Sequence, residues 1–183
     1  NLTTVVAKIF GNDTLCANED KEAEVFVYFY GISPYTFVYA INDILQNHII
    51  TTDNPYSIKK RDAGKYTLNY FEDGSNTSGS ISGQAMVTVL EPPIADFEAH
   101  PSSMTILYPS SQMEDKSIGN IINWQWYFGD NTGIDYSSNP SHLYKDSTGL
   151  YEVSLIIEDD MGCKDTASKI LSVANDYWIH IPN

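Results

Sequence analysis

The chain has 183 residues, and its 10 Lys and Arg oppose 24 Asp and Glu, for a formal net charge of −14. That charge argues against nucleic acid as a partner, because a phosphate backbone requires a basic surface, and it disfavours anionic membranes for the same reason. No apolar run approaches the roughly 20 residues that a membrane-spanning helix needs, so we expect no membrane insertion. A hydrophobic content of 42% suffices for one large domain or for two domains of about 90 residues.

Short alternating strands are predicted throughout the first half of the chain. The clearest covers residues 23–30, where Ala23, Val25, Val27 and Phe29 share one face. Its second face is also rather apolar, which suggests partial cover by a neighbour. Residues 72–83 are rich in Gly, Ser, Asn and Asp and are predicted to form a loop. Further strands are expected at residues 1–10, 35–41, 44–52, 55–58, 67–70 and 85–89. Roughly seven or eight short strands with regularly spaced turns are typical of a β-sandwich.

The segment Glu91-Pro92-Pro93 marks a domain boundary, because two prolines cannot join a central strand and they stiffen a short linker. We therefore expect one domain at residues 1–91, a second at residues 92–175 and a tail at residues 176–183. The second domain is predicted to have strands at residues 104–108, 123–128, 151–158 and 165–173, and a polar loop at residues 131–139. Neither half contains a convincing amphipathic helix. The predicted fold class is all-β, with two tandem antiparallel β-sandwiches.

One stretch of the second half is unusually rich in aromatic residues. Trp124, Trp126 and Phe128 recur at every second position, so in a strand they share one face. Gly129 and Asp130 then indicate a turn. We expect core positions for Trp126, Phe128, Tyr151, Tyr66 and Phe37, and exposed positions for Trp124, Tyr127, Tyr136 and Tyr177.

The sequence lacks the motifs of the common hydrolases, metalloproteases, phosphate loops and dinucleotide-binding folds. We therefore predict that the chain is not an enzyme, that it has no catalytic residue and no metal site, and we assign no binding residue. His48, His100 and His180 are isolated, and none has a Cys or His at metal-ligand spacing. Four acidic pairs fall in polar turns and are interpreted as solvated loops rather than general acid-base pairs: Glu19-Asp20, Glu72-Asp73, Glu114-Asp115 and Asp159-Asp160.

Cys16 and Cys163 are the only cysteines in the sequence. Two cysteines so far apart do not form a metal site by themselves. They either bridge the two domains or are two unpaired, partly buried small apolar residues, and the second interpretation is preferred.

Three sequence blocks occur in order in the second half: Trp126-Tyr-Phe128-Gly129-Asp130, Pro140-Ser-His142-Leu-Tyr144 and Gly149-Leu-Tyr151-Glu-Val153-Ser-Leu155. With the opening Ala95-Asp-Phe97, residues 93–174 resemble the PKD domain, a β-sandwich. The resemblance implies that His142 and Tyr144 pack over one end of the sandwich. Asn131 stands where the family usually has Gly, but Asn also tolerates a left-handed backbone, so we expect the turn to be kept.

Some secreted PKD domains bind calcium, and the resemblance raises that alternative here. Asp130, Asn131 and Asp135 supply oxygen atoms near one turn, although their spacing does not match an EF-hand loop. We predict no cofactor, with calcium at this turn as the alternative.

The first half carries Asp62-Ala-Gly64-Lys-Tyr66, which matches a tyrosine corner, in which the Tyr hydroxyl bonds to upstream backbone. Residues 1–91 therefore resemble an immunoglobulin-like module. Leu68 stands where such a domain often has its second cysteine, so the usual disulfide between the sheets is missing.

The form Gly162-Cys-Lys-Asp-Thr166 resembles PKD domains of Bacteroidetes surface proteins that the type IX secretion system exports and that are linked to gliding motility. The tail Trp178-Ile-His-Ile-Pro-Asn183 is similar to the lead-in of their C-terminal sorting domain, which itself is absent. The resemblance implies an extracellular, non-catalytic spacer of a large adhesin-like protein, held at the outer membrane surface through that sorting domain. Neighbouring domains and secretion components would be its protein partners. The alternative is a recognition module for a glycan or for a protein of the secretion or motility machinery.

Overall fold

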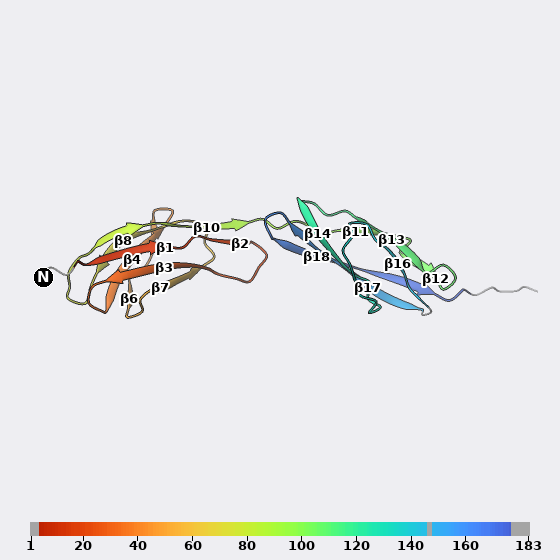
Figure 1. The fold of residues 1–183 in the computed structure, drawn as a ribbon, viewed down its shortest axis with the longest axis horizontal. Coiled ribbons are helices and arrows are strands. Elements are labelled where there is room, and N and C mark those ends of the chain that lie inside the picture. The colour runs from red at the N-terminus through yellow and green to blue at the C-terminus, as the bar shows by residue number, and fades with distance from the viewer. Residues whose placement is uncertain (1–3, 146–147, 177–183) are drawn as a thin grey trace, which may run out of the picture. The chain divides into compact units, whose positions relative to one another are not determined.

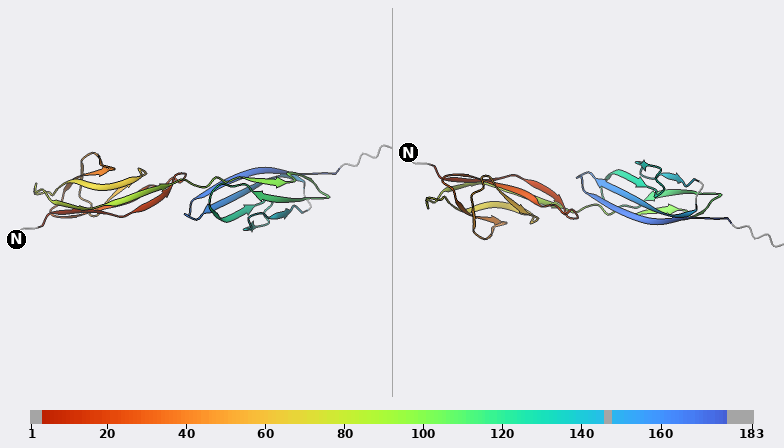
Figure 2. Two further views of the ribbon diagram at one scale, coloured as in Figure 1. Left: turned by 90° about the horizontal axis from the view of Figure 1, so that it is seen from above. Right: turned by 90° about the horizontal axis from the view of Figure 1, so that it is seen from below.

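The computed structural model describes residues 4–145 and 148–176 and divides the chain into two compact units, Asn1–Glu91 and Pro92–Asn183 (Figure 1). Every regular element within the described residues is a β-strand. The strands of each unit form two sheets, which confirms the predicted all-β class and the tandem sandwiches (Figure 2). The predicted tail at residues 176–183 lies, beyond Asp176, outside the described residues.

The first unit contains the strands β1 (Val6–Phe10), β2 (Asp13–Cys16), β3 (Ala23–Tyr30), β4 (Tyr35–Ile41), β5 (Ile44–Leu45), β6 (Ile49–Thr51), β7 (Tyr56–Lys60), β8 (Gly64–Glu72), β9 (Ser80–Gly83) and β10 (Ala85–Leu90). One sheet has the order β7-β3-β1-β9, and the other has the order β2-β10-β8-β4-β5, with β6 also paired to β4. β1 and β2 thus belong to different sheets. Gly11, with φ at 97°, lies between them and lets the chain cross from one sheet to the other.

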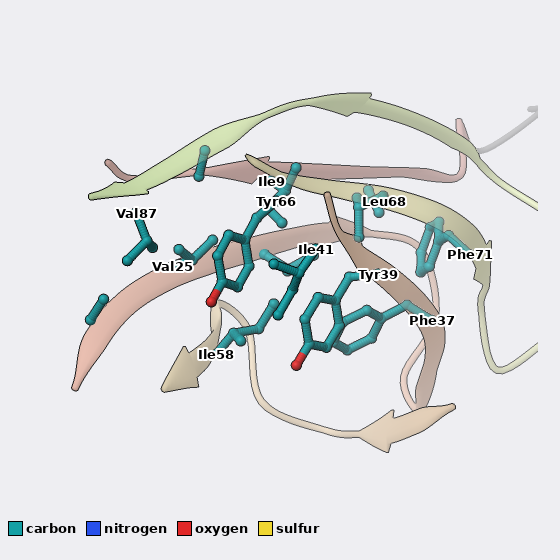
Figure 3. Packing of buried hydrophobic residues seen from close by; sticks show 14 of the residues in the cluster. Ile9, Val25, Phe37, Tyr39, Ile41, Ile58, Tyr66, Leu68, Phe71 and Val87 are labelled. Carbon is teal, nitrogen blue, oxygen red and sulfur yellow. The ribbon is translucent and has the colours of Figure 1, made fainter. Parts of the chain in front are cut away.

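The core of the first unit lies between its two sheets. The predicted inward face of β3 is buried as expected. Figure 3 shows Val25 and Ile9 of one sheet meeting Phe37 and Tyr66 of the other. Phe29 is the centre of an aromatic group, and its ring lies 4.6 to 5.4 Å from those of Tyr35, Phe37 and Phe71.

The second unit contains the strands β11 (Phe97–His100), β12 (Ser103–Thr105), β13 (Ser110–Asp115), β14 (Ile121–Tyr127), β15 (Ile134–Asp135), β16 (Ser141–Leu143), β17 (Gly149–Asp159) and β18 (Lys164–Ala174). One sheet has the order β11-β13-β16, and the other has the order β12-β18-β17-β14-β15. Trp126 is fully buried between them, with Phe97 edge-on to its ring at 5.1 Å. Val153, Leu155 and Ile157 of β17 complete the centre of this core.

Several strands differ from the sequence prediction. β9 falls in the predicted loop at residues 72–83, and its four residues are all exposed, so no hydrophobic pattern marks it. It exists because it pairs in parallel with β1. No strand is predicted where β13 lies, because its hydrophobic pattern is weak: one of its inward positions is Ser111, whose hydroxyl donates to the Pro101 carbonyl at 2.8 Å. The strand predicted at residues 104–108 ends at Thr105, and the one at residues 44–52 is two short strands.

Candidate functional sites

The motif residues of the second unit gather in one packed group, the motif cluster, formed by Phe128, Asp130, His142 and Tyr144. The His142 ring stacks on Phe128 with centroids 3.9 Å apart and an interplanar angle of 4°. Its Nε2 lies 2.7 Å from Oδ2 of Asp130, and Tyr144 packs edge-on against the same ring at 4.7 Å. These contacts give His142 a structural role, and they agree with the packing that the resemblance implies.

The turn after the Trp-rich strand has the backbone that the sequence predicts. Gly129 has φ at 79° and Asn131 has φ at 63°, so the left-handed conformation is kept with Asn in place of Gly. Oδ1 of Asp130 accepts hydrogen bonds from the backbone N–H of Thr132 at 3.2 Å and from its hydroxyl at 2.6 Å. Burial acts to raise the pKa of Asp130, but the Thr132 and His142 contacts outweigh it and hold the pKa below its usual value.

The same contacts bear on the calcium alternative. Both carboxylate oxygens of Asp130 already have protein partners, and Oδ1 of Asp135 accepts from the N–H of Ser137 at 2.8 Å and from its hydroxyl. Because a carboxylate oxygen can accept a hydrogen bond and coordinate calcium at the same time, these contacts organise the turn without deciding the question, and calcium there stays the alternative.

Three of the four acidic pairs differ from their interpretation as solvated loops: Glu114-Asp115 lies on β13, and each of two other pairs has one buried residue. Asp73 and Asp159 are buried, with exposed fractions of 4% and 8%. Asp73 accepts hydrogen bonds from the N–H of Ile32 at 2.9 Å and from Ser75 and Thr77, and these contacts, that of Ile32 foremost, lower its pKa to about 2. Oδ1 of Asp159 accepts from the N–H of Cys163 at 2.8 Å and from that of Met161. Both carboxylates organise the backbone of a loop.

The interpretation of His100 as isolated is also wrong. Its Nε2 lies 3.2 Å from Oε2 of Glu98 and 3.6 Å from Oε2 of Glu114. Glu98 and His100 alternate on β11, which is a weak sequence signal, but Glu114 joins them only through the pairing of β11 with β13. Sequence spacing cannot reveal such a cross-strand group.

The first unit presents a group of aromatic side chains, the aromatic face, formed by the exposed Phe10, Tyr28 and Tyr30 and the half-buried Phe26. Phe10 and Phe26 stack at 6.0 Å, and Tyr28 and Tyr30 lie 5.1 Å apart. A hollow of about 260 Å³ is lined by Phe10, Tyr28, Tyr30 and Lys8. The partial cover that the sequence predicts for this side of β3 is found at Phe26, which is half-buried, whereas Tyr28 and Tyr30 are 38% and 58% exposed.

The other aromatic predictions can be compared with the structure one by one. Trp126, Phe128, Tyr66 and Phe37 are buried as predicted, whereas Tyr151 is only half-buried. Tyr127 and Tyr136 are exposed as predicted, and Tyr177 lies outside the described residues. Trp124 is half-buried rather than exposed, because it packs against the core of the second unit, and its Nε1 donates to Oδ2 of Asp115 at 2.7 Å.

The predicted tyrosine corner is present. The hydroxyl of Tyr66 donates to the backbone carbonyl of Asp62 at 2.8 Å. Burial, together with the negative charge of Asp62, raises the pKa of Tyr66 to about 12. The hydroxyl therefore remains a donor at every physiological pH and anchors the start of β8.

Neither Cys16 nor Cys163 is a free thiol, and both are buried. The preferred interpretation of two unpaired thiols is therefore wrong. Two lone cysteines without a spacing motif carry no sequence signal of their oxidation state.

Within the part of the chain that the structure describes, no helix is long and apolar enough to cross a membrane.

Comparison with known proteins identifies the second unit. The family profile for the PKD domain matches residues 91–173, so the chain contains a PKD domain. Among solved structures, the PKD1 domain of the Vibrio cholerae metalloprotease PrtV is 29% identical, covering 45% of this chain and 98% of its own, with a TM-score of 0.39. The PKD1 domain of Vibrio anguillarum Epp is 26% identical, covering 46% and 96%, with a TM-score of 0.40.

Some solved structures match across both units. A Ca²⁺-stabilised adhesin, by which an Antarctic bacterium binds ice, covers 95% of this chain and 50% of its own, with 10% identity and a TM-score of 0.57. At that identity the likeness concerns the tandem β-sandwich fold alone. The search of the curated proteins finds no match.

Proposed function

We propose that the chain is a non-catalytic structural segment of a large, secreted, adhesin-like protein at the cell surface. PKD and related β-sandwich domains are typically non-catalytic, and the PKD domain supports an extracellular structural or binding module. In this proposal residues 1–91 form an immunoglobulin-like domain and residues 92–175 the PKD domain. The segment holds a distal part of the protein away from the surface.

The observation that carries this proposal is the packing of the motif residues inside the second unit. The polar motif residues His142, Asp130 and Tyr144 pack against one another and against Phe128. His142 and Asp130 have side chains only 12% exposed. The motif cluster thus stabilises the sandwich, and the residues that match the PKD motif have structural roles.

We further propose that the parent protein is exported by the type IX secretion system of a Bacteroidetes species and contributes to gliding motility. The support is the form Gly162-Cys-Lys-Asp-Thr166, whose first two residues lie in the turn between β17 and β18 and whose last three begin β18. Secretion components and neighbouring domains are then its partners. The flanking sequence tests this directly: a sorting domain after Asn183 is expected, and a cytoplasmic enzyme domain there would contradict it.

A replacement experiment tests the structural role. In the parent protein, the whole segment is exchanged for an unrelated pair of β-sandwich domains of similar length, and surface display and adhesion are measured. A spacer predicts that both are retained. Loss of adhesion with normal display would overturn the spacer and favour a recognition module.

The aromatic face favours recognition of a glycan as the second candidate function. Planar aromatic rings that remain exposed on a sheet can stack on the apolar faces of sugar rings, and the two tyrosine hydroxyls and Lys8 add polar contacts. A glycan array with the isolated chain tests this. A Tyr28→Ala/Tyr30→Ala double variant should lose binding by about tenfold or more, whereas Tyr108→Ala, which removes an 80% exposed tyrosine of the other unit, should not. Equal binding by all three proteins, or none, rejects this candidate.

A further inference from the structure

Three potential metal ligands lie together on the outer face of the sheet that β11 and β13 share in the second unit. Glu98 and His100 are two residues apart on β11, so they point to the same side. Glu114 of β13 is the direct cross-strand partner of Glu98. All three side chains are exposed, and one donor atom of each lies within 4.8 Å of the others.

The separations match those around a small tetrahedral ion. A tetrahedral zinc ion with bonds of about 2.1 Å holds its ligand atoms about 3.4 Å apart. Nε2 of His100 lies 3.2 Å from Oε2 of Glu98, in a hydrogen bond that an ion would replace, and 3.6 Å from Oε2 of Glu114. The spacing along β11 and its pairing with β13 already bring these atoms together, which reduces the ordering that binding would require.

The donor set selects the class of ion. Calcium and magnesium are bound by oxygen atoms, whereas zinc and its neighbours in the first transition row accept imidazole nitrogen together with carboxylate. We propose that Glu98, His100 and Glu114 form a site for a divalent transition metal ion such as Zn²⁺, with a fourth position open to solvent.

The neighbouring side chains provide no fourth protein ligand. Gln112 lies opposite His100 in the strand register, but its amide turns toward β16, where it donates to the carbonyls of Asn139 at 2.8 Å and Pro140 at 3.2 Å. It is therefore no fourth ligand. Lys116 pairs with Oε1 of Glu114, which leaves Oε2 directed at His100. The positive charge of the Lys116 ammonium also repels the metal ion, so it lowers the affinity of the site.

The ion would link β11 to β13 and stabilise the folded second unit, because it binds the folded state only. Untagged chain is titrated with Zn²⁺ by calorimetry, and its thermal unfolding is measured with and without the ion. One ion per chain and a raised unfolding temperature are expected. Co²⁺ in place of Zn²⁺ should give the strong visible absorption of a tetrahedral site.

Variants of exposed residues locate the site without disturbing the core. His100→Ala should weaken Zn²⁺ binding at least about tenfold, and Lys116→Gln should strengthen it about fivefold by removing one nearby charge. His48→Ala, which removes a histidine of the other unit, should have no effect. Undetectable Zn²⁺ binding, or equal binding by wild type and His100→Ala, would overturn the proposal; circular dichroism of each variant confirms that it is folded.

Discussion

Comparison of Gly129 with Gly162 separates two contributions to stability: the free-energy cost of a side chain on a left-handed backbone, and the cost of a steric clash with a neighbouring strand. Its φ is 79°, and a Cβ built on it would lie 2.7 Å from the carbonyl oxygen and 2.9 Å from the nitrogen of Glu152. Gly162 has a similar φ of 87°, but a Cβ there would meet nothing within 4 Å. The two positions lie in the same unit, so each serves as the control for the other.

The expected magnitudes follow from these two terms. A left-handed conformation costs an L-residue about 1–2 kcal/mol, which applies to both Gly129→Ala and Gly162→Ala. The backbone clash applies to Gly129→Ala alone and adds about 1–3 kcal/mol, as overpacking of a rigid site does. Gly129→Ala should therefore lower the free energy of unfolding by about 2–5 kcal/mol and Gly162→Ala by about 1–2 kcal/mol.

Urea unfolding followed by tryptophan fluorescence measures this difference. All three tryptophans of the sequence lie at or after Trp124, so the signal comes from the second half of the chain. If both variants lose the same stability, the close approach of Gly129 to β17 contributes nothing, and the reasoning from the Cβ contacts is refuted.

Three further predictions concern a core residue, a buried carboxylate and a loop anchor. Trp126→Ala removes a fully buried ring and its hydrogen bond to the Ser137 carbonyl, and it should cost about 3–5 kcal/mol in urea unfolding followed by circular dichroism. Asp73 has a folded-state pKa of about 2, below its ordinary value of about 3.9, so its stabilising charge is present above about pH 4 and is lost as pH falls toward 2. Asp73→Asn should lack that pH-dependent contribution, whereas exposed Asp53→Asn should keep it, in thermal unfolding at each pH. Arg61 donates to three carbonyls of the loop between β2 and β3, so Arg61→Gln should speed proteolysis of that loop without changing the melting temperature of the unit by more than a few degrees.

The elements that the sequence predicts well are those with bulky residues at every second position. β3 begins and ends at the predicted residues, and the buried face of β17 falls where Val153 and Leu155 place it. In these strands the alternating apolar residues are also the buried ones, because one face of the strand packs against the opposite sheet. The two compact units divide between Glu91 and Pro92. The assignment of residues 1–91 to an immunoglobulin-like domain stays a proposal.

The features that the sequence does not predict depend on strand register or on backbone donors. β9 has no buried side chain and is defined only by its partner β1. Asp73 is buried because backbone N–H groups surround it, and no residue type reveals where those groups converge. The group of Glu98, His100 and Glu114 forms only when β11 and β13 pair in one register, and a shift by one residue would turn Glu114 to the other face.

The aromatic residues show most clearly why an alternating pattern cannot by itself identify a site. Trp126 on β14 and Phe128 just after its end, and Phe26 and Tyr28 on β3, are both pairs of aromatic residues two positions apart. The first pair is buried because the opposite sheet and Phe97 cover it. The second lies on the outer side of β3, where Tyr28 remains exposed. Period two assigns residues to a common face, but only the neighbouring sheet decides whether that face becomes core or surface. A search for ligands of this chain should therefore begin at the outer faces of its sheets, and the Trp-rich strand is the wrong place to look.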